Sequence, residues 1–304
     1  MIVAELPAGR LRGQLASSGL RLRLGPLVAE IRSPFRVVEQ SIALHYAAHE
    51  VATPADFADF HVAVDAPTSV RRLLRRQALF RSGGHRPFLP LPAAQAFPML
   101  EWGLNWCVSA NCHQYLVVHG AVAERGGRAM ILPAPPGSGK STLCAALVAR
   151  GWRLLSDELT LIDITSGRIV PLPRPISLKN ESIEAVRRFW PEAAIGPVVH
   201  DTVKGSVAHV RPPSESVRRS MQDVIPGWVV LPRFKAGHPM SLEPVSKAAA
   251  FMQMVDSAFN YSIHGRGGFE ALADLIAASG CYRFEYGGAL LDAVRVLDTL
   301  ADAR

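Results

Sequence analysis

The chain has 304 residues, 49% of them hydrophobic and 19% charged, and a formal net charge of +7 at pH 7. This length and apolar share exclude a chain too small or too polar to form a core, and they allow two domains or one large α/β domain with an appendage. The net positive charge favours anionic ligands such as nucleotides and acidic peptide surfaces. Since the sequence has no run of about eighteen apolar residues and no signal-peptide pattern at its start, we expect a cytoplasmic protein without a membrane partner.

The first 98 residues are predicted to form a small α+β unit. Residues 21–33 alternate partly between apolar and polar side chains around Gly25 and Pro26, and residues 59–67 form a second alternating run, so both are expected in one sheet. Residues 85–98 contain four prolines, which helix interiors and central strands do not accept, and they are expected to be a linker. We expect this unit to bind a partner or to build a homo-oligomer.

Basic residues are densest within residues 69–81, where four arginines recur at helical spacing beside leucines: Arg71, Arg72, Arg75 and Arg76. The favoured interpretation is a solvated helix face, which could attract an acidic acceptor. No nucleic-acid-binding motif accompanies these arginines, so nucleic acid is not expected as a partner.

Residues 99–304 are predicted to form an α/β domain that begins with a helix at 99–114. Strands alternate with helices along this part of the chain, which is typical of that fold class. The expected elements, in chain order, are strands at 115–125 and 128–134, a helix at 141–151, a strand with an acidic interruption at 152–163, a strand within 166–178, a strand at 228–234, a helix at 247–259, a glycine-rich break at 264–268, a helix at 269–279, a strand at 281–286 and a helix at 290–301.

The strand at 128–134 runs into a phosphate-binding pattern. Residues 134–141, APPGSGKS, match G-x-x-x-x-G-K-[S/T] except that Ala134 replaces the first Gly, and strand, loop and helix follow in the order that the pattern requires. The sequence therefore predicts a nucleotide-binding loop with the following binding residues: Pro136, Gly137, Ser138, Gly139, Lys140, Ser141 and Thr142.

The residue types of this loop suit phosphate chemistry. Gly137 and Gly139 allow the backbone to turn its N–H groups toward a phosphate, where a Cβ would clash or forbid the required φ angle. Lys140 can bridge β- and γ-oxygens and Ser141 can bind Mg²⁺, while the helix that begins there adds its positive dipole end. A nucleotide and Mg²⁺ are therefore the expected ligands.

An acidic pair follows the loop after a short spacing. Lys140 and Asp157 are seventeen residues apart, which is enough for one helix, a turn and a return strand, so Asp157 and Glu158 are expected on a strand beside the loop. There one carboxylate can bind Mg²⁺ while the other accepts a hydroxyl proton near the γ-phosphate, as a phosphotransferase needs. A purely structural role is disfavoured because buried carboxylates require a cation or a donor.

Together these motifs resemble those of the HPr kinase/phosphorylase family, and more closely those of the bacterial HPr-kinase-related kinases of the kinase A type. That family combines a His-Gly pair, a loop of the form G-x-S-G-x-G-K-S and a short-spaced L-V-A-D-D. The corresponding residues here are His119-Gly120, the loop at 134–141 and the stretch LLSDE at 154–158. The resemblance covers residues 115–165, extends weakly toward the C-terminus and does not reach the first hundred residues.

The resemblance implies a P-loop kinase core of the type shared with phosphoenolpyruvate carboxykinase, and it implies ATP as the nucleotide. It also implies that Asp157 is the general base toward an acceptor serine, and that His119 stands near the attacking hydroxyl and tunes the charge of Asp157. Ser141, Asp157 and Glu158 are the implied Mg²⁺ ligands.

The sequence departs from the family pattern in three places. Ala134 replaces the first Gly of the loop, Thr142 stands where the family usually has an acid, and Glu158 replaces the second Asp. The later segment that the family uses for the reverse, phosphate-driven dephosphorylation is not found, so kinase activity alone is predicted.

A second candidate segment lies at residues 200–219, which are too polar for a core and too apolar for a simple linker. Lys204 and Arg211 within it could close over the γ-phosphate as a basic loop and act in catalysis. An ordinary surface hairpin is the alternative.

The favoured function is an ATP- and Mg²⁺-dependent kinase that phosphorylates a serine or similar hydroxyl on a small protein or peptide. Two alternatives stay open, a nucleotide-binding regulatory NTPase that switches a protein interaction and a small-molecule kinase, because a phosphate loop alone excludes neither.

Overall fold

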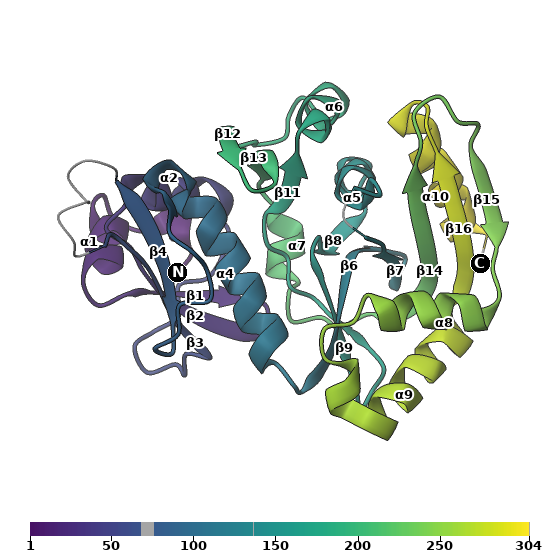
Figure 1. The fold of residues 1–304 in the computed structure, drawn as a ribbon, viewed down its shortest axis with the longest axis horizontal. Coiled ribbons are helices and arrows are strands. Elements are labelled where there is room, and N and C mark those ends of the chain that lie inside the picture. The colour runs from purple at the N-terminus through teal and green to yellow at the C-terminus, as the bar shows by residue number, and fades with distance from the viewer. Residues whose placement is uncertain (68–75, 136, 304) are drawn as a thin grey trace.

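The computed structural model describes residues 1–67, 76–135 and 137–303. These residues form a mixed α/β fold with sheets of five, eight and three strands (Figure 1). No helix in the described ranges is both long and apolar enough to cross a bilayer.

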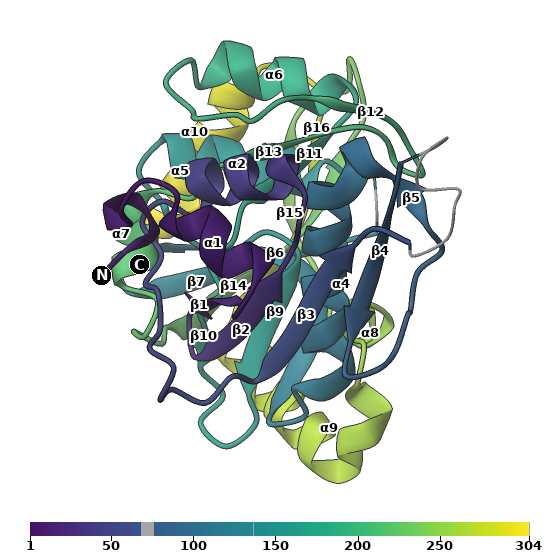
Figure 2. The ribbon, with the colours of Figure 1, turned by 90° about the vertical axis from the view of Figure 1, so that its left-hand side faces the viewer.

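The N-terminal unit is built on the five-stranded sheet, in the order β1-β2-β3-β4-β5, and Figure 2 shows β1 to β4 side by side. The two predicted strand regions lie in this sheet, as expected. Its strands are β1 (Leu20–Leu24), β2 (Leu27–Arg32), β3 (Phe60–Asp65), β4 (Gln77–Ser82) and β5 (Leu91–Pro92). Its helices are α1 (Arg10–Ala16), α2 (Arg36–His45) and α4 (Ala96–Asn111), with short 3₁₀ turns at Val3–Glu5 and Ala93–Gln95.

The β1–β2 hairpin contacts the rest of the molecule at its turn. Gly25 has a φ of 59°, and a Cβ there would meet the carbonyl oxygen of Pro171. Positive φ and close backbone approach both favour glycine. The turn that the sequence predicts from Gly25 and Pro26 is therefore also a contact between the N-terminal sheet and a later part of the chain.

The expectation of a linker at 85–98 is wrong. β5 pairs with β4 inside this stretch, and Pro98 lies in the first turn of α4. Proline is tolerated there because the first N–H groups of a helix have no partner within the helix. Helix α4 packs on β3 and β4, so residue 98, the expected domain boundary, falls within a helix that covers the N-terminal sheet.

The eight-stranded sheet has the order β10-β9-β6-β7-β14-β16-β15, with β8 also paired to β6. Its strands are β6 (Tyr115–Arg125), β7 (Arg128–Pro133), β8 (Arg153–Ser156), β9 (Leu159–Asp163), β10 (Ile169–Val170), β14 (Ile225–Phe234), β15 (Ser241–Pro244) and β16 (Gly280–Tyr286). The associated helices are α5 (Lys140–Ala149), α8 (Lys247–Asp256), α9 (Tyr261–Ala278) and α10 (Leu290–Asp302).

Three strands of this sheet run parallel and end at the same edge of the sheet. β6 is antiparallel to β7, β8 and β9, whereas β14 is parallel to both β7 and β16. The carboxyl ends of β7, β14 and β16 therefore meet at one edge, which is where open α/β sheets bind ligands.

The three-stranded sheet, in the order β11-β13-β12, supplies one wall near that edge. Its strands are β11 (Ile176–Lys179), β12 (Val199–Thr202) and β13 (Gly205–Val210), and the neighbouring helices are α6 (Glu181–Phe189) and α7 (Ser214–Arg218). Strands β12 and β13 form a hairpin, but β13 is the central strand of this sheet and its residues 207–210 are buried, so the alternative of an ordinary surface hairpin for residues 200–219 describes only part of this segment.

The glycine-rich stretch at 264–268 interrupts the helical backbone, as predicted. Within α9, Gly265 has non-helical dihedral angles, φ 52° and ψ −125°, so two helical pieces meet at a kink there. Glycine adopts this backbone conformation without a Cβ clash.

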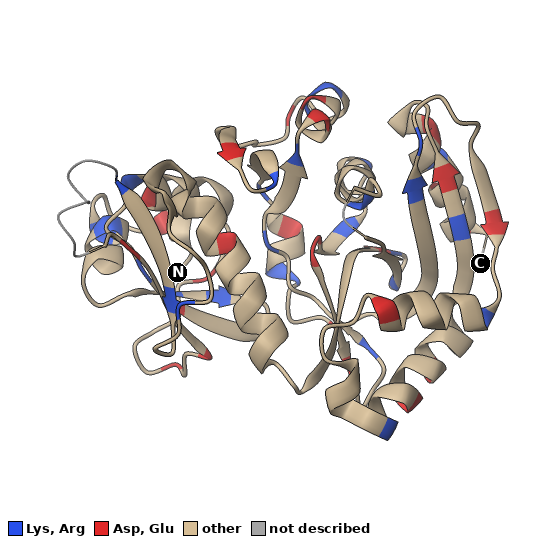
Figure 3. Ribbon diagram, in the orientation of Figure 1, with Lys and Arg blue, Asp and Glu red and all other residues tan. Residues whose placement is uncertain are grey.

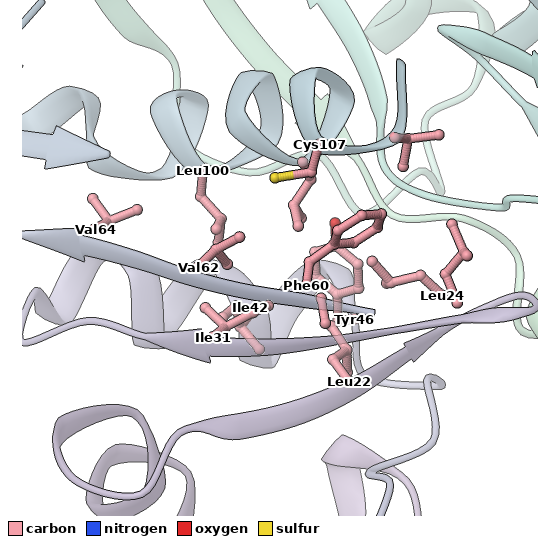
Figure 4. Close-up of a cluster of buried hydrophobic side chains, with 14 of the residues drawn as sticks. Leu22, Leu24, Ile31, Ile42, Tyr46, Phe60, Val62, Val64, Leu100 and Cys107 are labelled. Carbon is pink, nitrogen blue, oxygen red and sulfur yellow. The ribbon is translucent and has the colours of Figure 1, made fainter. Parts of the chain in front are cut away.

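One apolar core joins the N-terminal unit to the larger sheet. Figure 4 shows side chains of the N-terminal strands meeting those of α2 and α4, among them Leu22, Phe60 and Leu100. The same cluster continues into Val117 of β6 and Leu161 of β9. Helix α4 is part of this shared core, and Figure 1 shows it on the side of the N-terminal unit that faces the larger sheet.

A buried ion pair fastens α4 to the segment after β10. Arg174 Nη2 lies 2.7 Å from Glu101 Oε2, and these residues are 7% and 4% exposed. The Tyr46 hydroxyl donates to Glu101 Oε1 at 2.6 Å, and Arg174 Nη1 donates to Asn105 Oδ1 at 2.7 Å. A buried pair is not by itself a gain in stability, but loss of one partner leaves an uncompensated charge in the core.

Lysines and arginines lie on elements of all three sheets, interspersed with acidic residues (Figure 3). Of the four arginines predicted on one helix face, Arg71, Arg72 and Arg75 lie outside the described residues, and Arg76 is exposed just before β4.

Replacement of Glu101 by Gln is expected to lower the free energy of unfolding by about 3 kcal/mol, because Arg174 then stays buried without its counter-charge. Urea denaturation monitored by circular dichroism measures this change. The matched control is Glu270→Gln, which breaks an exposed Arg–Glu pair of the same 2.7 Å length with Arg266 and should change stability by less than about 0.5 kcal/mol. Equal effects of the two substitutions would contradict the role of burial.

Candidate functional site

The glycine loop, residues 134–139, connects β7 to α5. Gly137 and Gly139 have φ values of 86° and 88°, so both adopt the left-handed conformation that the phosphate-loop prediction assigns to them. Lys140 is the first residue of α5 and Ser141 the second, which places both at the positive end of the helix. Pro136 lies outside the described residues.

Two later strands hold the loop in place. The backbone N–H of Phe234, at the end of β14, donates to the carbonyl of Ser138 at 3.0 Å. The Tyr286 hydroxyl, at the end of β16, donates to the carbonyl of Gly139 at 3.0 Å. A Cβ on Gly139 would meet both aromatic side chains, so glycine is required here for space as well as for φ.

The acidic pair lies in a gap between β8 and β9, opposite the middle of β6. The spacing predicts a strand beside the loop. Strands β8 and β9 both pair with β6, which lies between them and β7, the strand that leads into the loop. Gly120 of β6 pairs with Pro133 on one side, and its N–H donates to the carbonyl of Glu158 at 3.2 Å on the other. This register brings Asp157 and Glu158 level with the start of the glycine loop.

Asp157 is buried, with 3% of its surface exposed. Its Oδ2 accepts a hydrogen bond from the backbone N–H of Ser177 at 2.9 Å, while Oδ1 has no hydrogen-bond partner among the described residues. Burial and the neighbouring Glu158 raise the pKa of Asp157 to about 6, against the opposing effects of Lys140, the Ser177 N–H and the Ser141 hydroxyl.

Glu158 has the opposite pKa shift. Burial alone would raise its pKa, but the charges of Lys179, Lys140 and Lys204 outweigh burial and lower it. Its Oε1 lies 3.6 Å from Lys179 Nζ, and its Oε2 lies 3.7 Å from His119 Nδ1. The two adjacent carboxyls therefore differ in proton affinity, which is the usual sign of divided acid–base roles.

His119 is brought to the site as predicted, but its ring lies against Glu158. Burial and the charge of Lys140 lower the pKa of His119 to about 4, so the ring is neutral at pH 7. Its ring also meets that of Phe259 edge-on, with 6.0 Å between centroids. Nε2 is buried without a hydrogen-bond partner among the described residues.

Of the two basic residues proposed from residues 200–219, only Lys204 acts on the acidic pair. Lys204 lies in the turn between β12 and β13, with Nζ 5.0 Å from the centre of the Trp102 ring, and its charge lowers the pKa of Glu158. Arg211 is exposed beyond the end of β13, and its charge acts on His45 of α2. The structure therefore does not place Arg211 in this cluster of charges.

Sequence reasoning missed Lys179, the nearest ammonium to Glu158. Lys179 ends β11, a short strand with no motif around it. One pattern could have located it. The strand residues I-S-L at 176–178 are followed directly by the polar run K-N-E-S at 179–182, where β11 ends and α6 begins.

A cleft of about 630 Å³ opens over the glycine loop, a volume within the range of about 300–1,000 Å³ for small-molecule sites. Loop and helix residues form its floor, β11 and α6 one wall, and the ends of β14 and β16 the other. Predicted binding residues on its surface are Gly137, Gly139, Lys140, Ser141 and Thr142.

A second, narrow cavity of about 20 Å³ lies between α4 and the acidic pair. Several polar atoms of its lining residues are buried without hydrogen-bond partners in the described part of the chain: Trp102 Nε1, Asp157 Oδ1, Arg174 Nε, Ser177 Oγ and His209 Nε2. Buried polar groups normally have partners, and a volume above about 10–15 Å³ is enough for one water molecule.

The residues present fit a phosphate chain and Mg²⁺. Lys140 is only 4% exposed, and a buried ammonium calls for an anion beside it. The orphaned Oδ1 of Asp157 and the Ser141 hydroxyl are oxygen donors of the kind that Mg²⁺ prefers. In the described ranges, no group of three or more His, Cys, Asp or Glu residues is placed to hold a metal ion.

Comparison with known proteins gives a structural similarity. The solved HPr(Ser) kinase/phosphatase from Coxiella burnetii aligns with 62% of this chain and 94% of its own, at 10% sequence identity and a TM-score of 0.26. No protein-family model and no curated protein matches the chain. The roles of the site residues therefore rest on their geometry and charges.

Replacement of Asp157 by Asn is expected to stabilise the ligand-free protein at neutral pH. Since the pKa of Asp157 is about 6 in the fold against 3.8 without it, ionisation of this residue lowers stability as the pH rises from about 4 to 6. The stability difference between variant and wild type should be near zero at pH 4 and reach about 3 kcal/mol at pH 7. Urea titrations across this range in Mg²⁺-free buffer measure it.

The comparison of variant with wild type is needed because four histidines also titrate in this range, three of them buried and His119 partly buried. Removal from water lowers the pKa values of His45, His49, His119 and His209, and this contribution is common to both proteins. Asp163→Asn serves as a control with the opposite trend, because hydrogen bonds from Ser166 lower the pKa of Asp163. A pH-independent difference for Asp157→Asn would show that Asp157 is not a raised-pKa group.

Proposed function

We propose that this protein is an ATP- and Mg²⁺-dependent kinase that transfers the γ-phosphate to a serine or similar hydroxyl on a small protein or peptide. One observation carries the proposal: Asp157 is buried with an unpartnered carboxylate oxygen, beside the lysine and serine that begin the helix after a glycine loop. Burial of such a group is unfavourable, and a substrate that binds and uses it would account for it.

The cleft suits a nucleoside triphosphate. Backbone N–H groups of the loop, the N-terminus of α5 and Lys140 would surround the phosphates, which are the only strongly anionic part of the nucleotide. Ser141 and Glu158 would hold Mg²⁺ together with phosphate oxygens, with Asp157 beside them and free to accept a proton. When bound, the ion neutralises charge that builds up on the transferred group.

Asp157 has the properties of the general base. A pKa of about 6 leaves it mostly ionised at pH 7 yet basic enough to accept a proton. The hydroxyl oxygen of the acceptor bonds to the γ-phosphorus as its proton passes to Asp157, and the bond to the bridging β,γ-oxygen breaks to release ADP. The proton then leaves Asp157 to solvent.

The cations around Glu158 would stabilise this reaction electrostatically. Lys179 and Lys204 come from β11 and from the β12–β13 turn, and both lower the pKa of Glu158. Glu158 thus stays ionised while Asp157 cycles between protonation states. Fixed positive charge close to the transferred phosphoryl group is a major contribution to catalysis of this class of reaction.

The narrow cavity beside Asp157 supports a second candidate, a regulatory NTPase. Its volume of about 20 Å³ accommodates one water molecule but no amino-acid side chain, and Asp157 is among the residues that line it. A water held there could attack the γ-phosphate in place of an acceptor hydroxyl. The two functions differ in product, a phosphoester in one case and inorganic phosphate in the other.

Asp157→Asn is expected to reduce phosphoryl transfer at least about 100-fold, the usual contribution of a general base, while ATP affinity stays within a few fold. Phosphorus-31 NMR of wild type with ATP, Mg²⁺ and a panel of serine-containing peptides and small proteins measures the product, and calorimetry measures binding. Asp163→Asn, at the end of β9 that lies away from the acidic pair, should leave transfer unchanged. ATP bound but converted only to inorganic phosphate would support the regulatory NTPase, and ATP bound but never consumed would refute both enzymes.

A further inference from the structure

The cleft over the glycine loop has a polar end and an apolar end. Ser177 and Lys179 line it near the acidic pair. At the other end it is lined by Phe234, Tyr286 and Leu290, which stand at the carboxyl ends of β14 and β16 and at the start of α10. Figure 1 shows β11 and α6 on one side of α5 and β14, β16 and α10 on the other.

Phe234 is held firmly yet presents an open surface. Its backbone N–H is bonded to the loop at Ser138, and its ring meets the ring of Tyr286 at 63°, with 5.4 Å between centroids. Tyr286 is fixed in turn by its hydroxyl bond to Gly139 and by stacking on Phe284 at 5.3 Å. Even so, Phe234 is 45% exposed.

The direction of a bound nucleotide follows from these two ends. Phosphates bind at the loop and Lys140, and the transferred phosphate must lie toward Asp157 if that residue is the base. The opposite end of the nucleotide then points toward Phe234, Tyr286 and Leu290. A nucleobase is a flat aromatic group, and stacking on an aromatic side chain is a common way for proteins to hold a base.

We propose that the apolar end of the cleft is a nucleobase subsite in which the purine ring stacks on Phe234. The proposal rests on the proposed function insofar as the loop must bind a nucleotide, but it adds the part of the ligand that no motif in the sequence assigns. Tyr286 acts as a positioning residue, because it braces both the Phe234 ring and the loop.

The test compares two ligands that share their phosphates. Calorimetry with Mg²⁺ measures the affinity of ATP and of inorganic tripolyphosphate for wild type, Phe234→Ala and Phe234→Trp. Phe234→Ala should weaken ATP binding about tenfold or more and leave tripolyphosphate binding within about twofold, whereas Phe234→Trp should keep ATP affinity within about threefold. Phe269→Ala is the matched control, because Phe269 is 52% exposed on α9 and does not line the cleft.

The outcomes separate this inference from the proposed function. ATP affinity that is unchanged in Phe234→Ala, or equal losses for ATP and tripolyphosphate, would overturn the nucleobase subsite while leaving a phosphate-binding loop. Wild type that binds neither ligand would overturn both proposals. Selective loss of ATP affinity in a protein that transfers no phosphate would support the subsite and refute the kinase.

Discussion

The contact between two adjacent carboxyls, the buried Asp157 and the partly buried Glu158, is the constraint on which the arrangement of the site depends. Two neighbouring acids that are largely removed from water cannot both ionise without cations close by. Lys140, Lys179 and Lys204 meet this requirement, and they come from three separate elements around the pair. Their positions favour ionised Glu158 and leave Asp157 with the raised pKa, so one structural requirement divides the two residues chemically.

The parts of this site that could be predicted from sequence are those with local signals. β6, β7, α5 and the acidic interruption at Asp157 follow one another within fifty residues, and each is set by periodicity, glycine or a short motif. A local pattern can mark Lys179 as the end of a strand, but the presence of Lys179 and Phe234 at the site could not be predicted, because it depends on which strands pair over long sequence separations. The prediction of a linker at 85–98 is wrong for another reason. Proline excludes a residue from a helix interior but not from the first turn of a helix, where Pro98 lies.

The N-terminal unit reaches the site through the chain between β10 and β11. Arg174 in this segment is paired with Glu101 of α4, and three residues later the N–H of Ser177 binds Asp157. The same short segment therefore carries a buried contact to the N-terminal helix and a hydrogen bond to the proposed base. The N-terminal unit, which lies outside the sequence resemblance, is thus linked through this segment to the hydrogen bond on Asp157.

The core shared by both units also decides which pieces of the chain can exist alone. Val117, Leu161 and Leu172 are covered from the N-terminal side, in the cluster that contains α4. A fragment that started near residue 99 would begin inside that helix and would leave these side chains open to water. Such a fragment would contain the glycine loop and the acidic pair, yet it would expose a large apolar surface. A protein truncated to the residues that carry these motifs would therefore be prone to aggregate.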